Sequence, residues 1–392
     1  MKNRSTRPLW RILALLLSLT MLAAACGGSD SDDAADTDDA SASDDATSPG
    51  EGDETATNTD LGEIDYLGWE GYDTFFGAND ASITKLGVDF NATYMGAPSD
   101  IASAFASGGG DGIDLLAWTS ANHEQYRGIE GTLSPITVEE VPNLAGLIER
   151  FGDDQWGQFQ DDNGDWLAIP FSFAPIGITY DSSRVSPTSY ADLLDPSFTG
   201  RIGVPDVPGL HVQAAAAALG YDANVLTPEE LDDVIEFMRP MWAQARSISP
   251  SFGDIIGLLA SGEIDAAYGG YPGLGAFTEN PDIVTVFPTE GTFSFVEVYS
   301  IPATADNREA ALAFINEMLD PEVNAAINEA FAQATTVEAA IPLMSDANTA
   351  LYPYNDLDSL LEGTSVMTLP GGANGVGMGD FIEAYGSLAA GG

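Results

Sequence analysis

Basic residues are scarce in this chain of 392 residues. It contains 12 lysines and arginines against 61 aspartates and glutamates, which gives a formal charge of -49 at pH 7. Nucleic-acid binding needs clustered lysine and arginine side chains on the phosphates, so this balance argues strongly against nucleic acid as a partner. Such an acidic surface repels itself at low ionic strength and is eased by screening salt. We interpret the charge as the adaptation of an exported protein to a saline medium.

Cysteine and histidine are scarcer still, which argues against disulfide bonds and against metal sites built from these residues. Cys26 is the single cysteine, so a disulfide within the chain cannot form. The two histidines, His123 and His211, are too far apart for His–His or Cys–His metal spacing. No G-x-S-x-G nucleophile elbow is present. The acidic run Asp161–Asp165 does not continue into a calcium-binding loop, and it predicts a turn. We therefore expect no catalytic residue, no metal and no cofactor.

The N-terminus has an apolar run, but it is too short for a membrane-spanning helix. Basic residues precede Ile12–Leu22, and small residues follow it, as in a secretory signal peptide. The alanines that lead into Cys26 resemble a bacterial lipobox, in which the thiol receives diacylglycerol and becomes the mature N-terminus. Ala23 stands where that pattern prefers leucine. The alternative is an ordinary signal peptide followed by an incidental cysteine.

These features divide the first part of the chain. We predict a lipoprotein signal peptide at 1–25, then a lipidated Cys26 and a disordered acidic linker over 26–62. From Gly27 to Asp60 there is no aromatic and no basic residue. A segment with low hydrophobicity and high net charge cannot offset the entropy lost on folding. The linker would separate a lipid anchor from the globular body.

In the globular body, strand patterns alternate with helix patterns. The predicted strands include Val88–Tyr94, Gly112–Ser120, Ile202–Val204, Asp265–Tyr268 and Ile283–Phe287. The predicted helices include Ser99–Ala106, Leu210–Leu219, Pro228–Met238, Ile255–Ser261, Arg308–Leu319 and Pro321–Ala332. This alternation predicts an α/β fold with a parallel sheet, whose ligands bind outside the carboxyl ends of the strands.

One stretch, Gly291–Pro302, combines a charge with aromatic residues at the spacing of a strand. Phe293, Phe295, Glu297 and Tyr299 share one face if the stretch is extended. A carboxylate on a largely apolar face is costly unless it has a partner. Either Glu297 faces water on a surface strand, or it lies among aromatic rings in a cleft and binds a cationic ligand. We expect this strand to cross between two lobes.

A series of short motifs runs from about residue 64 to residue 346. The motifs are Gly68–Tyr72, Gly112–Ser120, Ile169–Tyr180, Ser189–Leu193, Phe198–Gly200, Leu219–Tyr221, Gly262–Asp265, Phe295–Glu297 and Ile301–Pro302. In this order they resemble the spermidine/putrescine-binding family of solute-binding lipoproteins from ABC importers. No single motif is specific, but their order without large gaps is. The resemblance implies the two-lobe fold called periplasmic binding protein type 2, with mixed sheets flanked by helices and hinge strands between the lobes.

The resemblance also implies the binding residues. In that family aromatic side chains box the ligand, and Trp69, Tyr72, Tyr268 and Phe295 match them. Thr119 and Ser120 match hydroxyl positions, and Glu297 matches an acidic residue that binds an amine. An aromatic cage with one carboxylate suits a cation.

The chain also departs from this pattern. Where polyamine binders have a second acidic cluster, only Asp206 remains. In addition, Gly71 replaces an acid and Ala121 replaces an aromatic residue. A long diamine would therefore lose the carboxylate for its far end, and the identity of the ligand stays open.

Together these observations predict a receptor with two lobes. We expect the first lobe over 63–172 and 299–392 and the second over 173–298, with hinges near 171–175 and 298–301. The expected function is to capture a small cationic organic solute, a polyamine or a similar compound, and to deliver it to ABC permease transmembrane subunits. The expected protein is a monomer, exported and anchored by lipid to the outer face of the cytoplasmic membrane. The alternatives are the same fold with another cargo, such as a quaternary ammonium or amino-acid-derived compound, and less favoured, an extracellular hydrolase.

Overall fold

The structure is a computed structural model that describes most of the chain after the acidic linker. The described residues are 61–73, 86–95, 99–108, 110–152, 158–249, 251–361, 364–366 and 376–390. The predicted signal peptide, Cys26 and nearly all of the linker lie outside them. Within the described ranges, no helix has both the length and the apolar character that crossing a membrane requires.

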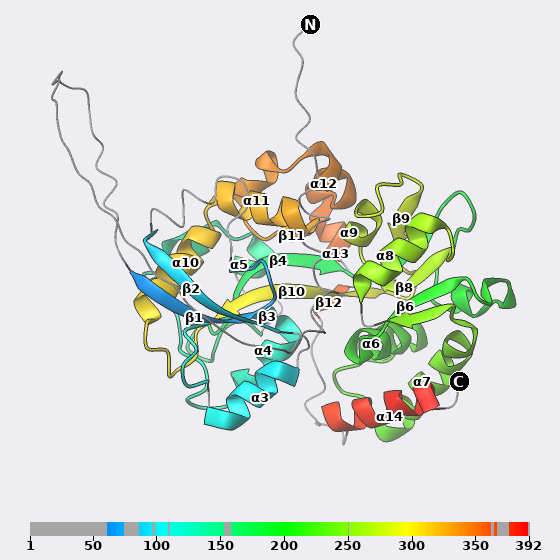
Figure 1. Ribbon diagram of the computed structural model, residues 1–392, viewed down its shortest axis with the longest axis horizontal. Helices are drawn as coiled ribbons and strands as arrows, with labels where there is room; N and C mark the ends of the chain where they lie inside the picture. Colours follow the sequence, from blue (N-terminus) through cyan, green and yellow to red (C-terminus); the bar gives the residue numbers. More distant parts are fainter. Residues whose placement is uncertain are drawn as a thin grey trace, which may run out of the picture. The chain divides into compact units, whose positions relative to one another are not determined.

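One sheet has seven strands in the order β11-β4-β10-β3-β1-β2, with β12 paired to β10 (Figure 1). The strands are β1 (Gly62–Gly68), β2 (Val88–Tyr94), β3 (Leu115–Thr119), β4 (Ile169–Pro175), β10 (Thr292–Ser300), β11 (Ala334–Thr335) and β12 (Thr364–Val366). β1 runs parallel to β2 and β3, whereas β10 runs antiparallel to β3 and β4. The sheet is therefore mixed, and β10 lies near its middle.

A second sheet has five strands in the order β7-β6-β8-β5-β9. They are β5 (Gly177–Asp181), β6 (Ile202–Pro205), β7 (Ser247–Ser249), β8 (Ala266–Gly270) and β9 (Ile283–Val286). β6 is parallel to β7 and β8, whereas β5 is antiparallel to β8 and β9. We call each sheet, with the helices that pack on it, a lobe. Two mixed sheets flanked by helices confirm the predicted fold class.

The helices have clear start and stop signals. They are α3 (Ser99–Gly108), α4 (Ser120–Arg127), α5 (Glu149–Gly152), α10 (Arg308–Met318), α11 (Pro321–Phe331), α12 (Asp346–Leu351) and α13 (Leu357–Leu361), followed on the second lobe by α6 (Pro208–Leu219), α7 (Pro228–Gln244), α8 (Phe252–Ser261), α9 (Pro272–Ala276) and α14 (Met378–Ala390). Thr227 and Glu230 form a capping box at the start of α7. Gly220 ends α6 in the left-handed conformation at φ 77°.

The core of the second lobe follows the alternation of strand residues. Ala266 and Tyr268 of β8 pack in one apolar cluster with α6, α7 and α14, whereas Ala267 packs in another with α8. Successive strand residues point to opposite faces, so helices cover both faces of this sheet. Tyr268 is consequently a core residue with no exposed surface.

The chain passes between the sheets at places that differ in part from the predicted hinges. β4 of the first sheet ends at Pro175 and β5 of the second begins at Gly177, so this crossing lies at Ile176, directly after the predicted range 171–175. The return crossing lies between β9 and β10, at 287–291, and not at 298–301. All of β10 pairs within the first sheet, because its neighbours β3, β4 and β12 supply its ladder hydrogen bonds.

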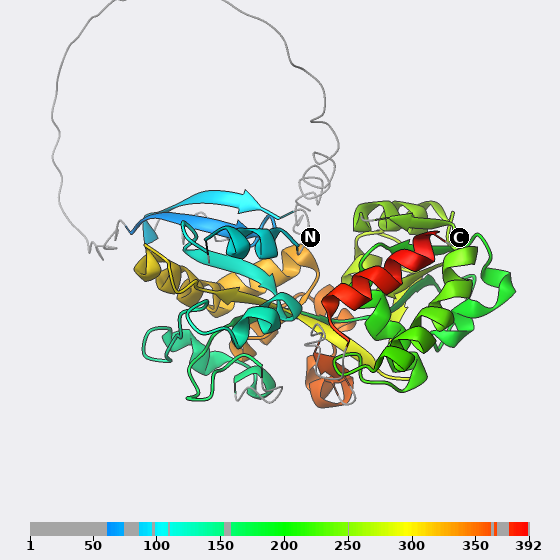
Figure 2. The same ribbon diagram turned by 90° about the horizontal axis from the view of Figure 1, so that it is seen from below.

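The C-terminal segment also differs from the expectation, which assigned 299–392 to the first lobe. Helix α14 packs against α6 and α7 of the second lobe (Figure 2, red against green). Val376, Phe381, Tyr385 and Leu388 bury apolar surface in that lobe's core. The end of the chain thus returns to the second lobe, because its apolar face has a partner there.

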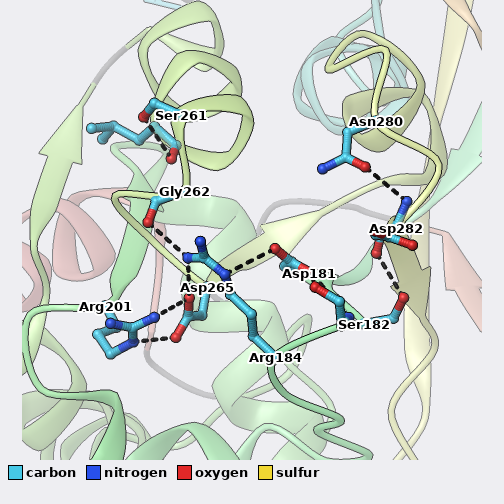
Figure 3. A network of polar contacts seen from close by, with 11 residues as sticks. Asp181, Ser182, Arg184, Arg201, Ser261, Gly262, Asp265, Asn280 and Asp282 are labelled. Atoms are coloured by element: carbon cyan, nitrogen blue, oxygen red, sulfur yellow. Dashed lines mark hydrogen bonds and ion pairs between the residues drawn. The ribbon is translucent and has the colours of Figure 1, made fainter.

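An arginine cluster fixes the strand ends of the second lobe (Figure 3). Arg184 contacts Asp265 at 3.0 Å and Asp181 at 3.3 Å, and Arg201 makes a further ion pair with Asp265. Burial alone would raise the pKa of Asp265, but hydrogen bonds from the two arginines outweigh it and lower the pKa. The cluster joins the starts of β6 and β8 to the end of β5.

Candidate binding site

Glu297 lies in the interior of the first sheet. On β10 it is opposite Thr119 of β3 on one side and Ser172 of β4 on the other. The register of the β10–β4 pair shifts between Glu297 and Val298, as at a β-bulge. The side chain is 5% exposed, so the surface-strand alternative is wrong.

The carboxyl group of Glu297 is buried, and its hydrogen bonds do not offset the cost of removing its charge from water. Its Oε2 atom has no hydrogen-bond partner among the described residues. Burial raises its pKa from 4.5 to about 8, and a hydrogen bond from Tyr72 offsets this only in part. Because a buried carboxylate needs a partner, a cation placed beside it would be strongly favoured.

Aromatic rings surround this carboxyl group. The pKa values of Tyr72 and Tyr271 are raised, first by burial and then by the charge of Glu297, which places both tyrosines near it. The rings of Tyr271 and Phe295 pack edge to face with centroids 5.8 Å apart. Tyr271 follows β8 of the second lobe, whereas Phe295 and Tyr72 belong to the first. The site therefore draws on both lobes.

A polar chain holds Tyr72 in place. The Nε2 atom of Gln333 donates to the Tyr72 hydroxyl at 3.1 Å, and Ser172 donates to Oε1 of the same glutamine. The backbone carbonyl of Tyr72 accepts from the hydroxyl of Tyr299 at 2.6 Å. Gln333 and Ser172 could not be identified as site residues from the sequence. A single serine within a strand, or a single glutamine just before one, forms no pattern that indicates a binding site.

The other predicted residues are placed differently. Trp69 is half-buried in the loop after β1, and its carbonyl accepts from the Tyr66 hydroxyl at 2.7 Å. Thr119 donates to Oδ1 of Asn122 at 3.0 Å, and Ser120 begins α4 with its side chain buried.

Tyr268 does not join this group. Its ring stacks on His211 at 5.0 Å, and its hydroxyl donates to the His211 carbonyl at 3.1 Å. Tyr271, three residues later, contacts Phe295 instead. The prediction of Tyr268 as a wall of the cleft is thus replaced by Tyr271, because Tyr268 lies on the face of β8 that α6 covers.

The arrangement favours binding over catalysis. A carboxyl group among aromatic rings can hold a cation by charge and by cation–π attraction. Both histidines are engaged elsewhere: the ring of His123 bonds the Gln158 carbonyl at 2.8 Å, and the ring of His211 stacks on Tyr268 in the second lobe. Within the described residues, no cluster of three or more histidine, cysteine, aspartate or glutamate side chains could hold a metal ion.

Comparisons with known proteins agree on one family. The profile of the family described as bacterial extracellular solute-binding protein matches residues 79–350. The chain is 28% identical to the spermidine/putrescine-binding periplasmic protein of Escherichia coli K12 over 233 residues, 57% of this chain and 64% of that protein. It is 32% identical over 222 residues to the putrescine-binding periplasmic protein SpuD of Pseudomonas aeruginosa, 50% of this chain and 59% of that protein. The chain thus spans less than two thirds of the length of these relatives.

Solved structures give the same fold. The spermidine/putrescine ABC transporter substrate-binding protein PotD of Streptococcus pneumoniae superposes with a TM-score of 0.67 at 17% identity. The match covers 84% of this chain and 98% of that one. It supports the two-lobe type 2 binding-protein fold.

Proposed function

Because the chain belongs to the bacterial extracellular solute-binding proteins, a family of binding proteins and not of enzymes, we propose that it is the solute receptor of an ABC importer. It captures a small cationic organic solute between its lobes and delivers it to the transmembrane subunits of the permease. The polyamine-binding relatives support organic cations as the cargo class, and amines, from monoamines to polyamines, are the first compounds to test.

The buried carboxyl group of Glu297 is the observation that carries this proposal. It has an unpartnered oxygen, and aromatic rings from both lobes lie around it. A cation that enters there gains a charge-assisted hydrogen bond in a site shielded from water. Trp69, Tyr72, Phe295 and Tyr271 would contact the body of the solute, and Thr119 would border it.

A second cargo class also fits the same site. A quaternary ammonium group has no N–H to donate, and it is held by the faces of aromatic rings. The aromatic surroundings of Glu297 favour such a solute as much as they favour a primary amine. An amino-acid-derived cation is the remaining alternative.

We further propose that the protein acts outside the cell as a monomer, tethered through a lipid on Cys26. The signal-like N-terminus and the acidic linker support the export and the tether. The tether would keep the receptor close to its permease, which raises its effective concentration there.

A thermal-shift screen in high salt tests the cargo. Binding to the folded state alone raises the melting temperature. We expect alkylamines or quaternary ammonium compounds to raise it and their uncharged alcohol analogues to leave it unchanged. If only neutral or anionic solutes raise the melting temperature, the cationic cargo is wrong. Chemical turnover of any stabilising compound would contradict the receptor function.

A further inference from the structure

Besides Glu297, an acidic residue follows a strand of the second lobe at the edge that meets the site. β6 and β8 run parallel with Gly203 opposite Ala267, so their carboxyl ends share one edge of the sheet. β8 leads at that edge into Tyr271, whose ring contacts Phe295. β6 leads there into Asp206, immediately before α6. Asp206 is thus the candidate for a second charged anchor.

The C-terminal helix already engages Asp206. The hydroxyl of Tyr385 on α14 donates to Oδ1 of Asp206 at 2.6 Å. The ring of Tyr385 is fixed in place, because it stacks nearly parallel on His211 at 6.3 Å and meets Trp242 edge-on at 5.4 Å. Only 7% of Tyr385 is exposed. Asp206 itself is exposed, and a solute ammonium that approached its Oδ1 would have to compete with a hydroxyl that packing holds in position.

A third acid, next to Tyr72 on the first lobe, is also engaged. Asp73 is buried, and it accepts from the Tyr94 hydroxyl at 2.9 Å and from the Gly71 amide at 3.2 Å. Of these three acids, Glu297 alone is buried with an unpartnered oxygen.

Resting on the function proposed above, we propose that the site selects solutes with one positive charge and an uncharged tail, and that Tyr385 of the C-terminal helix withholds Asp206 from them. A dication would place its second charge among aromatic rings without a carboxylate. Desolvating that charge without an ionic partner opposes its binding. The C-terminal helix is therefore a determinant of specificity.

Calorimetry with the full-length protein and two matched probes tests this inference. The probes are 1-aminobutane and 1,4-diaminobutane, which differ by one ammonium group. We expect the parent protein to bind the monoamine at least as tightly as the diamine. Tyr385→Phe keeps the ring packing and removes the donated hydrogen bond. It should raise the affinity for the diamine by about fivefold to thirtyfold, the range between an exposed and a shielded ion pair.

A double variant is the control for this gain. Tyr385→Phe combined with Asp206→Asn should return the diamine affinity to the parent level, while monoamine binding stays within twofold throughout. The inference is overturned if the parent prefers the diamine by tenfold or more, or if Tyr385→Phe leaves the ratio of the two affinities unchanged. Either result leaves the receptor function intact. If neither probe nor any other cation binds the parent, the proposed cationic cargo itself fails.

Discussion

Replacing Glu297 by glutamine should have opposite effects on stability and on binding. The carboxyl group has a pKa of about 8 in the folded protein against 4.5 as an unperturbed group. Between these values it holds a proton in the folded chain and not in the unfolded one. The folded state therefore loses stability as the pH rises through this window. At about 1.4 kcal/mol per pH unit, the loss is on the order of 5 kcal/mol above pH 8.

Glutamine has nearly the shape of the protonated side chain and cannot ionise. We expect Glu297→Gln to match the parent in free energy of unfolding to within about 1 kcal/mol at pH 5. At pH 9, without ligand, the variant should be more stable by up to about 5 kcal/mol. The neighbouring tyrosines, Tyr72, Tyr271 and Tyr299, do not ionise in this range because burial raises their pKa values.

Ligand binding should respond in the opposite direction. A bound cation ionises Glu297, so binding to the parent releases a proton below pH 8 and tightens as the pH rises towards that value. Without the charge, the cation lacks its partner, which typically costs about 2–5 kcal/mol, or roughly 30-fold to several thousand-fold in affinity. The variant should also bind without releasing a proton.

Urea unfolding at pH 5 and pH 9 measures the first effect, and calorimetry in two buffers of different ionisation enthalpy measures the second. Glu338→Gln is the matched control, because Glu338 is exposed on the first lobe and should change neither quantity by much. The reasoning is refuted if Glu297→Gln shows the same pH dependence of unfolding as the parent. It is also refuted if the variant binds the cation within twofold of the parent.

Three further predictions concern other parts of the chain. Cys26→Ser should release the protein from membranes, as seen by fractionation, and continued membrane association would contradict the lipid anchor. Burial lowers the pKa of His123 and of His211 to about 4. Protonation of each histidine should therefore lower the free energy of unfolding by on the order of 3 kcal/mol as the pH falls from 6.5 to 4. Urea titrations in the Glu297→Gln background measure this loss without the opposing effect of Glu297 protonation, and a free energy of unfolding that does not change with pH would disprove it. Asp265→Asn should lower the free energy of unfolding by about 1.5–3 kcal/mol, because two arginines lose a charged acceptor, and an unchanged urea midpoint would show that the cluster is dispensable.

Much of the architecture was predictable because its signals are local. The predicted strand Val88–Tyr94 coincides with β2, and the predicted helices Ile255–Ser261 and Pro321–Ala332 differ from α8 and α11 only at their ends. Strand and helix periods depend on residues a few positions apart, and caps such as Thr227 act within one turn. Glu297 stood out for the same reason, since its charge lies in phase with aromatic residues of one strand.

The sequence by itself determined the fold class, the excess of negative charge and the strand that carries the buried carboxyl group. Tertiary structure decided which side chains meet that group. Gln333 bonds Tyr72 from 261 positions away, and Tyr385 bonds Asp206 from 179 positions away. It also decided that Tyr271, and not Tyr268, faces Phe295, because the helices that cover each face of β8 come from distant segments. Periodicity states which residues share a face, but only packing between distant segments determines which face is covered and which is left for a ligand.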